Sequence, residues 1–302
     1  MELADVIRQL YGEDVYLTDK AEISGGDIND AYHLYLSNGE NLFIKINANA
    51  KDDFFAAEKA GLEALHKAGA VTPSVIAYGK TKDNLSYLLL NYVRKSRPKR
   101  TYWEDLGHML AQVHCALVET ITGNSRFGFL ADNYIGQTRQ KNTGTDSWIE
   151  FFRNSRLKVQ MELAAGYFDK DDRQRCQNLL DNLDKYLVEP EFPSLIHGDL
   201  WSGNVMPDQN GSPMLIDPAV YIGHHEADIA MTELFGGFSP EFYDAYHEII
   251  PKESGYAERR DLYNLYHLLN HLNLFGRSYL TAVRRILKRY SSLSRILCKP
   301  PQ

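Results

Sequence analysis

The chain has 302 residues, 44% of them hydrophobic and 24% charged, which is typical of soluble globular proteins and long enough for two domains. Its net charge of −7 argues against nucleic acid as a partner, because surfaces that bind nucleic acid carry clustered positive charge. No apolar run approaches the roughly 20 residues of a membrane-spanning helix, and the first residues do not form a signal peptide, so no membrane partner is expected. Three widely spaced cysteines without metal-ligand spacing fit a reducing compartment, so we expect a cytoplasmic protein.

The first third of the chain carries the patterns of one sheet and two helices. Residues 1–10 predict a short amphipathic helix, and residues 52–67 predict a longer one that ends before Gly69. The dipeptide Asn38-Gly39 is a strong hairpin signal, because both residues readily adopt positive φ. Strands are predicted near 15–23, 31–36, 41–46, 75–78 and 87–93. These segments predict a five-stranded antiparallel sheet with one helix, residues 52–67, between its strands, in an N-terminal lobe of residues 1–93.

The rest of the chain is predicted to be mainly helical. Periodic apolar residues predict helices near 101–119, 146–164, 170–187, 225–235, 240–250, 257–275 and 278–289. A sheet-rich part followed by a helical part predicts an α+β protein with two lobes, the second covering residues 94–302. The two are joined by segment 94–100, in which five of the seven residues are basic. This segment is either a solvated surface loop or a basic rim beside a nucleotide cleft.

One segment of the helical part carries the strongest functional signal. Asp199 and Asn204 stand in the sequence His-Gly-Asp-Leu-Trp-Ser-Gly-Asn (197–204), and Asp217 ends a predicted short apolar strand that contains Leu215 and Ile216. Phosphoryl transfer from ATP needs a carboxylate to hold the attacking hydroxyl, and an amide plus a second carboxylate to hold Mg²⁺ on the phosphates. We therefore expect Asp199 to be the general base, and Asn204 and Asp217 to bind Mg²⁺. Each residue alone could be a turn or cap residue, but that explanation does not account for all three together.

The N-terminal part contains residues that suit the other half of an ATP site. Alternation places Lys45 on the opposite strand face from Ile44 and Ile46, and Glu58 on the following helix is its natural partner. A lysine held in this way contacts the α- and β-phosphates in kinases, and the alternative is a solvated surface lysine. The loop 24–29 has paired glycines, whose backbone N–H groups can approach phosphate oxygens. The expected nucleotide-binding residues are Gly25, Gly26, Lys45, Glu58, Leu90 and Tyr92, so the lobe of residues 1–93 is expected to bind the nucleotide.

Aromatic and histidine residues near the motif allow more than one interpretation. His197 is expected to orient the loop rather than carry protons, and we assign it with Trp201 to the substrate side of the site. The Trp201 indole either packs within the loop or forms a flat wall for a sugar-like substrate. The pair His224-His225 does not predict a zinc site, because adjacent histidines diverge on a helix and no cysteine accompanies them. A helix cap in which Asp228 bonds back to the catalytic loop is favoured instead.

In these residues the chain resembles the fructosamine kinase (ketosamine-3-kinase) family, in the aminoglycoside phosphotransferase and choline kinase branch of the protein-kinase-like fold. The resemblance runs in order through nearly the whole chain, in segments 24–29, 43–46, 58–65, 127–136, 197–204, 215–219 and 223–238. It implies a two-lobed protein-kinase-like fold and ATP-dependent phosphorylation of the 3-hydroxyl of a ketosamine. The acceptor would be a small glycated amine or a glycated protein lysine. Relatives often carry Arg where this chain has His225, so the contact made by that Arg is left open.

Two other functions use the same residues. The same chemistry could serve another amine-bearing alcohol, such as an aminoglycoside, choline or homoserine, although Trp201 and the aromatic segment 235–238 favour a ketosamine. A pseudokinase that only binds nucleotide or a partner protein is harder to reconcile with the chain, because all five expected catalytic and nucleotide-binding side chains are present. ATP turnover measured with a panel of substrates separates these possibilities.

Overall fold

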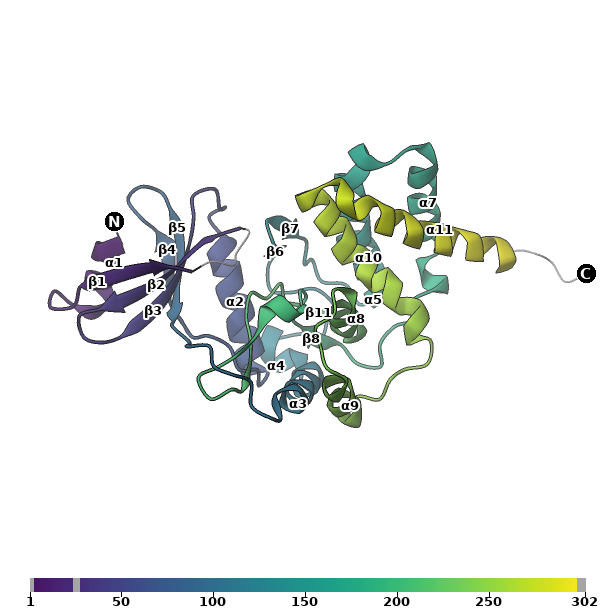
Figure 1. The fold of residues 1–302 in the computed structure, drawn as a ribbon. Coiled ribbons are helices and arrows are strands. Elements are labelled where there is room, and N and C mark those ends of the chain that lie inside the picture. The colour runs from purple at the N-terminus through teal and green to yellow at the C-terminus, as the bar shows by residue number, and fades with distance from the viewer. Residues whose placement is uncertain (1–2, 24–27, 298–302) are drawn as a thin grey trace, which may run out of the picture.

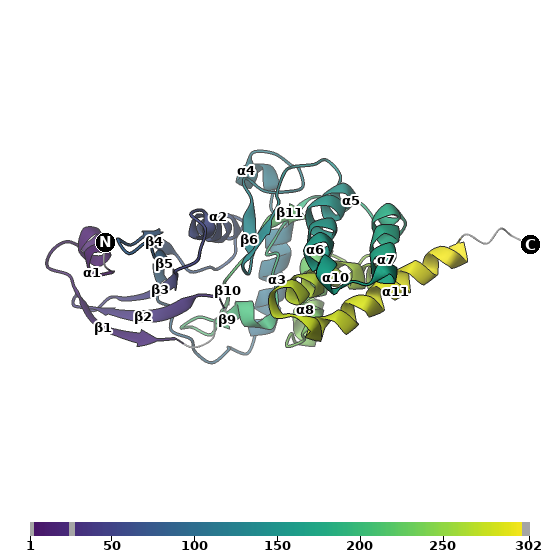
Figure 2. The same ribbon diagram turned by 90° about the horizontal axis from the view of Figure 1, so that it is seen from above.

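The structure, a computed structural model, describes residues 3–23 and 28–297, with side chains as far as Ser291. It shows an α+β architecture in which a sheet lies at one end and a mainly helical part fills the rest (Figure 1). Seen from above, the sheet and the pair α7 and α11 mark opposite ends of the molecule (Figure 2). No described helix is long and apolar enough to cross a membrane.

The sheet at the N-terminal end has five antiparallel strands in the order β1-β2-β3-β5-β4. This confirms the predicted sheet. The Asn38-Gly39 turn closes the hairpin between the second and third strands, and Gly39 has the expected positive φ of 89°. The same expectation for Asn38 is wrong, because its φ is not positive and the hairpin is closed by the Leu36 N–H donating to the Glu40 carbonyl oxygen across a longer loop. The strands are β1 (Leu17–Glu22), β2 (Asp30–Leu36), β3 (Asn41–Asn47), β4 (Val75–Lys80) and β5 (Ser86–Asn91).

The alternation of side chains along β3 and β5 gives the sheet two buried faces. One face contains Ile44 and packs against α1 (Leu3–Tyr11). The other face contains Leu88 and packs against α2 (Phe54–Lys67), which lies between the sheet and the helical part (Figures 1 and 2). Lys45 belongs to this second face, because it is paired with Leu88 across β3 and β5. The register therefore directs Lys45 toward α2 and the helical part.

The helical part largely follows the predicted segments. Two segments differ: the helix expected over 101–119 breaks between Cys115 and Val118, and the helix expected over 146–164 is interrupted by a π-helical turn over Phe152–Leu157. The wider turn places the buried Arg156 guanidinium within hydrogen-bond distance of the Lys141 carbonyl oxygen and Asn142 Oδ1, both at 2.7 Å. The helices are α3 (Tyr102–Cys115), α4 (Val118–Thr122), α5 (Trp148–Phe151), α6 (Lys158–Leu163), α7 (Lys170–Asp181), α8 (Glu226–Leu234), α9 (Pro240–Ile249), α10 (Tyr256–Phe275) and α11 (Leu280–Leu297).

The helical part also contains three short two-stranded sheets, of which only the strand that leads to Asp217 was predicted; it is observed over Pro213–Leu215. Two of them frame the motif segment: β8 lies directly before it and pairs with β11, which comes after Asp217, and the hairpin β9–β10 follows it. Each strand has only three residues, too few to show a clear alternation in the sequence. The strands are β6 (Asn133–Ile135), β7 (Thr138–Gln140), β8 (Ser194–Ile196), β9 (Val205–Pro207), β10 (Pro213–Leu215) and β11 (Tyr221–Gly223).

The basic segment 94–100 connects β5 to α3 along the β9–β10 hairpin. All of its residues are exposed except Ser96, whose hydroxyl donates to the Asp208 carbonyl oxygen (2.7 Å). The Lys99 N–H donates to the Gly211 carbonyl oxygen (3.0 Å). This placement fits the solvated-loop interpretation.

Candidate active site

The motif segment 197–204 forms a loop between β8 and β9, and a side chain of α8 holds this loop in place. Asp228, buried in the first turn of α8, accepts hydrogen bonds from the backbone N–H groups of His197 (2.6 Å) and Gly198 (2.9 Å). These bonds confirm that Asp228 bonds back to the loop. The His197 ring is fully buried, and burial lowers its pKa, so the neutral ring donates from Nε2 to the Ile216 carbonyl oxygen (2.9 Å).

The loop lies directly against the chain that follows β10. Gly198 has φ of 81°, and a Cβ at this position would lie 2.1 Å from the Ala219 carbonyl oxygen, so only glycine fits here. The Ile216 N–H donates to the Asn204 carbonyl oxygen (3.0 Å). Asp217, next along the chain, has φ of 54°, a left-handed conformation that aspartate tolerates better than most residues. These contacts bring both parts of the motif to one place.

Asp199 and Asn204 are in direct contact. The Asn204 amide Nδ2 donates to the Asp199 carbonyl oxygen (2.8 Å) and to its carboxylate Oδ2 (3.1 Å). Burial raises the pKa of Asp199 to about 7; the Asn204 hydrogen bond opposes this rise, and the Asp217 and Asp228 carboxylates add to it. A carboxyl group whose pKa lies near neutral pH is well matched to accepting a proton from a hydroxyl. Asn204 uses its nitrogen for Asp199, which leaves Oδ1 as its available ligand atom.

Lys45 joins the sheet to the motif. Its Nζ lies 2.6 Å from Glu58 Oε1 on α2 and also contacts the Asp217 carboxylate. The expected ion pair with Glu58 is therefore present, and Lys45, which is only 7% exposed, is not a solvated surface lysine. Burial alone would lower the pKa of Lys45, but the two carboxylates outweigh it and raise the pKa, so the side chain stays charged. A single cation thus bridges strand, helix and motif.

The two other expected residues of β5 and its extension lie on the same sheet face as Lys45. Leu90 is buried against α2, and Tyr92 stacks on His33 with ring centroids 3.6 Å apart and an angle of 4° between the rings. His33 Nε2 lies 2.8 Å from Asn41 Oδ1. His33 was not among the predicted nucleotide-binding residues, although its alternation on β2 places it on this face. Gly25 and Gly26 fall outside the described residues.

Trp201 lies on the outer side of the loop. A Cβ on Gly203 would lie 2.2 Å from Cη2 of the indole, so one side of the ring packs on the loop itself. Trp201 is nevertheless 41% exposed, and Phe235, which directly follows α8, is 43% exposed. Gly237, with φ of 97°, approaches the loop so closely that a Cβ would lie 2.8 Å from Ser202 Oγ. The indole therefore packs within the loop and also presents an open surface beside the segment after α8.

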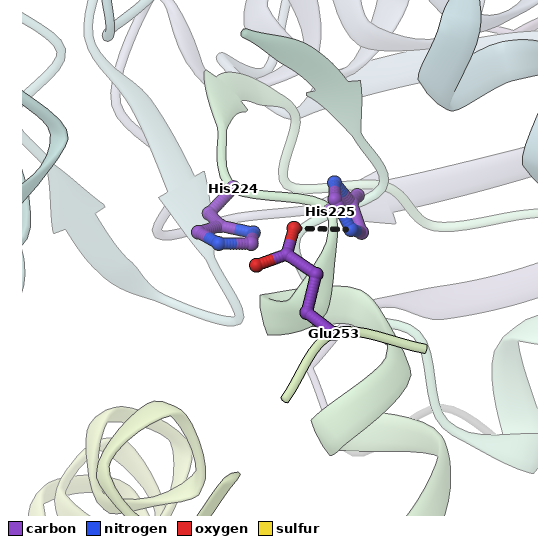
Figure 3. Close-up of side chains that lie close together, drawn as sticks. All are labelled: His224, His225 and Glu253. Carbon is purple, nitrogen blue, oxygen red and sulfur yellow. Dashed lines mark ion pairs between the residues drawn. The ribbon is translucent and has the colours of Figure 1, made fainter. Parts of the chain in front are cut away.

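Two histidines and a glutamate also meet at the start of α8 (Figure 3). One ligand atom each from His224, His225 and Glu253 lies within 4.8 Å of the others, because the histidines precede the helix rather than diverge on it. However, the Glu226 N–H donates to His224 Nδ1 (3.2 Å), so this neutral ring carries its proton on Nε2. The Arg259 guanidinium, bound to Glu226 at 2.6 Å, also lies 3.5 Å from Glu253. Both contacts argue against a metal ion here.

Comparison with known proteins points to one family. A family model described as fructosamine kinase matches residues 1–293. A relative from Synechocystis, assigned as a ketoamine kinase, is 39% identical over 298 residues, which cover 95% of each chain. The chloroplastic protein-ribulosamine 3-kinase of Arabidopsis thaliana is 38% identical over 285 residues, which cover 92% of this chain and 84% of that protein.

Solved structures agree with this result. A crystal structure from Thermobifida fusca, assigned as a fructosamine-3-kinase, is 33% identical with a TM-score of 0.82, and the match covers 95% of this chain and 97% of that one. An aminoglycoside phosphotransferase, solved with AMP-PNP and hygromycin B, superposes with a TM-score of 0.63 at 16% identity over 99% of this chain and 100% of that one. The second likeness shows the shared kinase-like fold alone.

Proposed function

Because the chain belongs to the fructosamine kinase family, and is therefore an ATP-dependent kinase acting on a sugar hydroxyl, we propose that it phosphorylates the 3-hydroxyl of a ketosamine. The substrate is the fructosamine or ribulosamine group of a small glycated amine or a glycated protein lysine. The relatives named ketoamine kinase and ribulosamine 3-kinase support this substrate class. The observation that carries the chemistry is the ion pair of Lys45 with both Glu58 and Asp217, which links the sheet to the motif.

In this proposal Asp199 accepts the proton of the attacking sugar hydroxyl. Its position in the loop is fixed by Asn204, and its raised pKa keeps it basic enough to take a proton near neutral pH. Asn204 Oδ1 and the Asp217 carboxylate, whose side chain is 48% exposed, are hard oxygen donors of the type that Mg²⁺ prefers. When bound, Mg²⁺ neutralises charge on the phosphates.

Lys45 and the sheet face around it would hold the nucleotide. Lys45 contacts Asp217 in the structure, so when ATP binds its Nζ can turn to the α- and β-phosphates while Glu58 keeps the side chain in place. Gly25 and Gly26 would approach the phosphates, and Leu90 and Tyr92 would contact the base from the same face as Lys45. We propose residues 1–93 as the nucleotide-binding lobe and residues 94–302 as the catalytic and substrate-binding lobe.

The exposed aromatic surface beside the loop would receive the sugar. Trp201 stands two residues after Asp199, and Phe235 stands two residues before Gly237, which closely approaches Ser202. Both residues expose large rings, and aromatic faces suit the C–H surfaces of sugars. His197 is fully buried, so its contribution to the substrate site is to fix the loop rather than to touch the sugar.

A substrate panel tests the proposal. ADP formation is measured with ribulosyl-lysine and fructosyl-lysine side by side, with an aminoglycoside and choline as controls, and NMR locates the phosphate on the product. We expect turnover with one or both ketosamines and phosphate on the 3-hydroxyl. Turnover only with a control would overturn the substrate class, and binding of ATP without any turnover would identify a pseudokinase.

A further inference from the structure

A chain of three buried polar side chains lies beneath the catalytic loop and reaches it through Asp228. His114 on α3 places Nε2 3.2 Å from Asp228 Oδ2 and Nδ1 2.8 Å from the Tyr246 hydroxyl on α9. His114 and Tyr246 are fully buried and Asp228 is 1% exposed. α3 and the consecutive helices α8 and α9, more than 100 residues later in the chain, therefore contribute one polar side chain each to the same buried position.

The directions of these hydrogen bonds follow from their partners. The Asp228 carboxylate accepts from the His197 N–H at Oδ2 and from the Gly198 N–H at Oδ1. A carboxylate can only accept, so His114 donates from Nε2 as a second donor to Oδ2, and its Nδ1 accepts from the Tyr246 hydroxyl. Each donor stabilises a buried carboxylate, and His114 is the one side chain among these three donors, so the imidazole helps to fix the rotation of Asp228.

We propose that His114 is a positioning residue for phosphoryl transfer: it fixes the carboxylate that holds the catalytic loop, and so places Asp199. This inference rests on the proposed role of Asp199. His114 touches neither substrate nor nucleotide, because it lies on the buried side of Asp228. Asp228 binds the two residues immediately before Asp199, so a rotated carboxylate would displace the base. A displacement of about 1 Å can lower turnover by about 100-fold.

Two substitutions at one position separate positioning from packing. His114→Gln retains an amide N–H that can take the place of Nε2–H, whereas His114→Leu fills the space without any donor. Tyr246→Phe removes only the hydroxyl that fixes the tautomer of His114. The matched control is His108→Gln: His108 lies on the exposed side of the same helix pair, where its Nε2 contacts Glu248 on α9 at 2.7 Å.

The first measurement is amide hydrogen exchange of the protein without ligand. In His114→Leu we expect exchange at 197–199 to rise by about tenfold or more, with near-normal protection in His114→Gln and His108→Gln. This readout needs no substrate, so a failure of the proposed function would appear separately, as absent turnover in the unmodified protein. If His114→Leu does not fold, faster exchange at 197–199 in Tyr246→Phe than in His108→Gln supports the proposal, and equal exchange overturns it.

The second measurement is steady-state kinetics. His114→Leu should lower kcat by about 10- to 100-fold while KM for ATP stays within about threefold, because the nucleotide contacts lie elsewhere. His114→Gln should recover kcat to within about threefold of the unmodified protein. The proposal is overturned if His114→Leu leaves kcat and loop protection unchanged, or if His114→Gln is as damaging as His114→Leu.

Discussion

Replacing Asp199 with Asn should lower turnover and raise stability at the same time. Asn keeps the shape of the side chain but cannot accept the proton of the sugar hydroxyl, and such proton acceptance contributes about 10²–10⁴ in rate. We therefore expect turnover to fall by about that factor. Binding of Mg·ATP should be largely kept, because the proposed ligands Lys45 and Asp217 are unchanged.

The expected gain in stability follows from the pKa of Asp199. Burial, with the neighbouring carboxylates, raises this pKa from 3.8 to about 7. The folded protein therefore binds a proton more tightly than the unfolded chain between these values, and its unfolding free energy falls as pH rises through this window. Three pH units at about 1.36 kcal/mol each give an upper limit of about 4 kcal/mol. Asn is uncharged and avoids this penalty, but the substitution also alters the hydrogen bond to Asn204. We therefore expect the unfolding free energy of Asp199→Asn to exceed that of the unmodified protein by about 2 kcal/mol near pH 8.

Two assays test these effects. ADP release is followed with a ketosamine, and urea unfolding of the protein without ligand is measured near pH 5 and near pH 8. The stability advantage of Asp199→Asn should be clearly larger at the higher pH. Asp244→Asn, an exposed carboxylate on α9, is the control and should change neither quantity. Turnover within about threefold of the unmodified protein would refute the base assignment, and a pH-independent advantage would refute the raised pKa.

Three further substitutions test the other contacts. Lys45→Ala leaves Glu58 buried without its cation, so we expect a loss of about 3–5 kcal/mol in urea unfolding and a raised KM for ATP; unchanged values would contradict the ion-pair account. Asp217→Ala should abolish most of the dependence of ATP affinity on Mg²⁺ in calorimetry, and an affinity that still rises with Mg²⁺ would exclude Asp217 as a ligand. Gly203→Ala should displace the Trp201 indole and so change tryptophan fluorescence. We expect it to raise KM for the ketosamine but not for ATP. An equal change in both KM values would argue against a contact between the Trp201 indole and the sugar.

Features encoded by local patterns could be predicted from the sequence. The Asn38-Gly39 turn and the alternation of β2 and β3 define the hairpin, and this register places Lys45 on the face that meets Glu58. The motif spacing likewise places Asp199 and Asn204 in one short loop, where the structure shows their side chains in contact.

Features that depend on distant segments could not be predicted. The π-helical turn in 152–157 has its reason in the contacts of Arg156 with residues 141 and 142, which periodicity does not show. The stacking of Tyr92 on His33 needs the pairing of strands from two hairpins. His114 and Tyr246 reach Asp228 only after three helices pack, and nothing in their local sequence distinguishes them from other apolar-face residues.

The most direct test of the account is a crystal structure with Mg²⁺ and a non-hydrolysable ATP analogue. We predict the metal on Asn204 Oδ1 and the Asp217 carboxylate, and Lys45 Nζ turned from Asp217 to the phosphates while Glu58 still holds it. Asp199 should face the γ-phosphate across the space that a sugar hydroxyl would occupy. A nucleotide bound away from Lys45, or a metal that contacts neither Asn204 nor Asp217, would contradict the central claim.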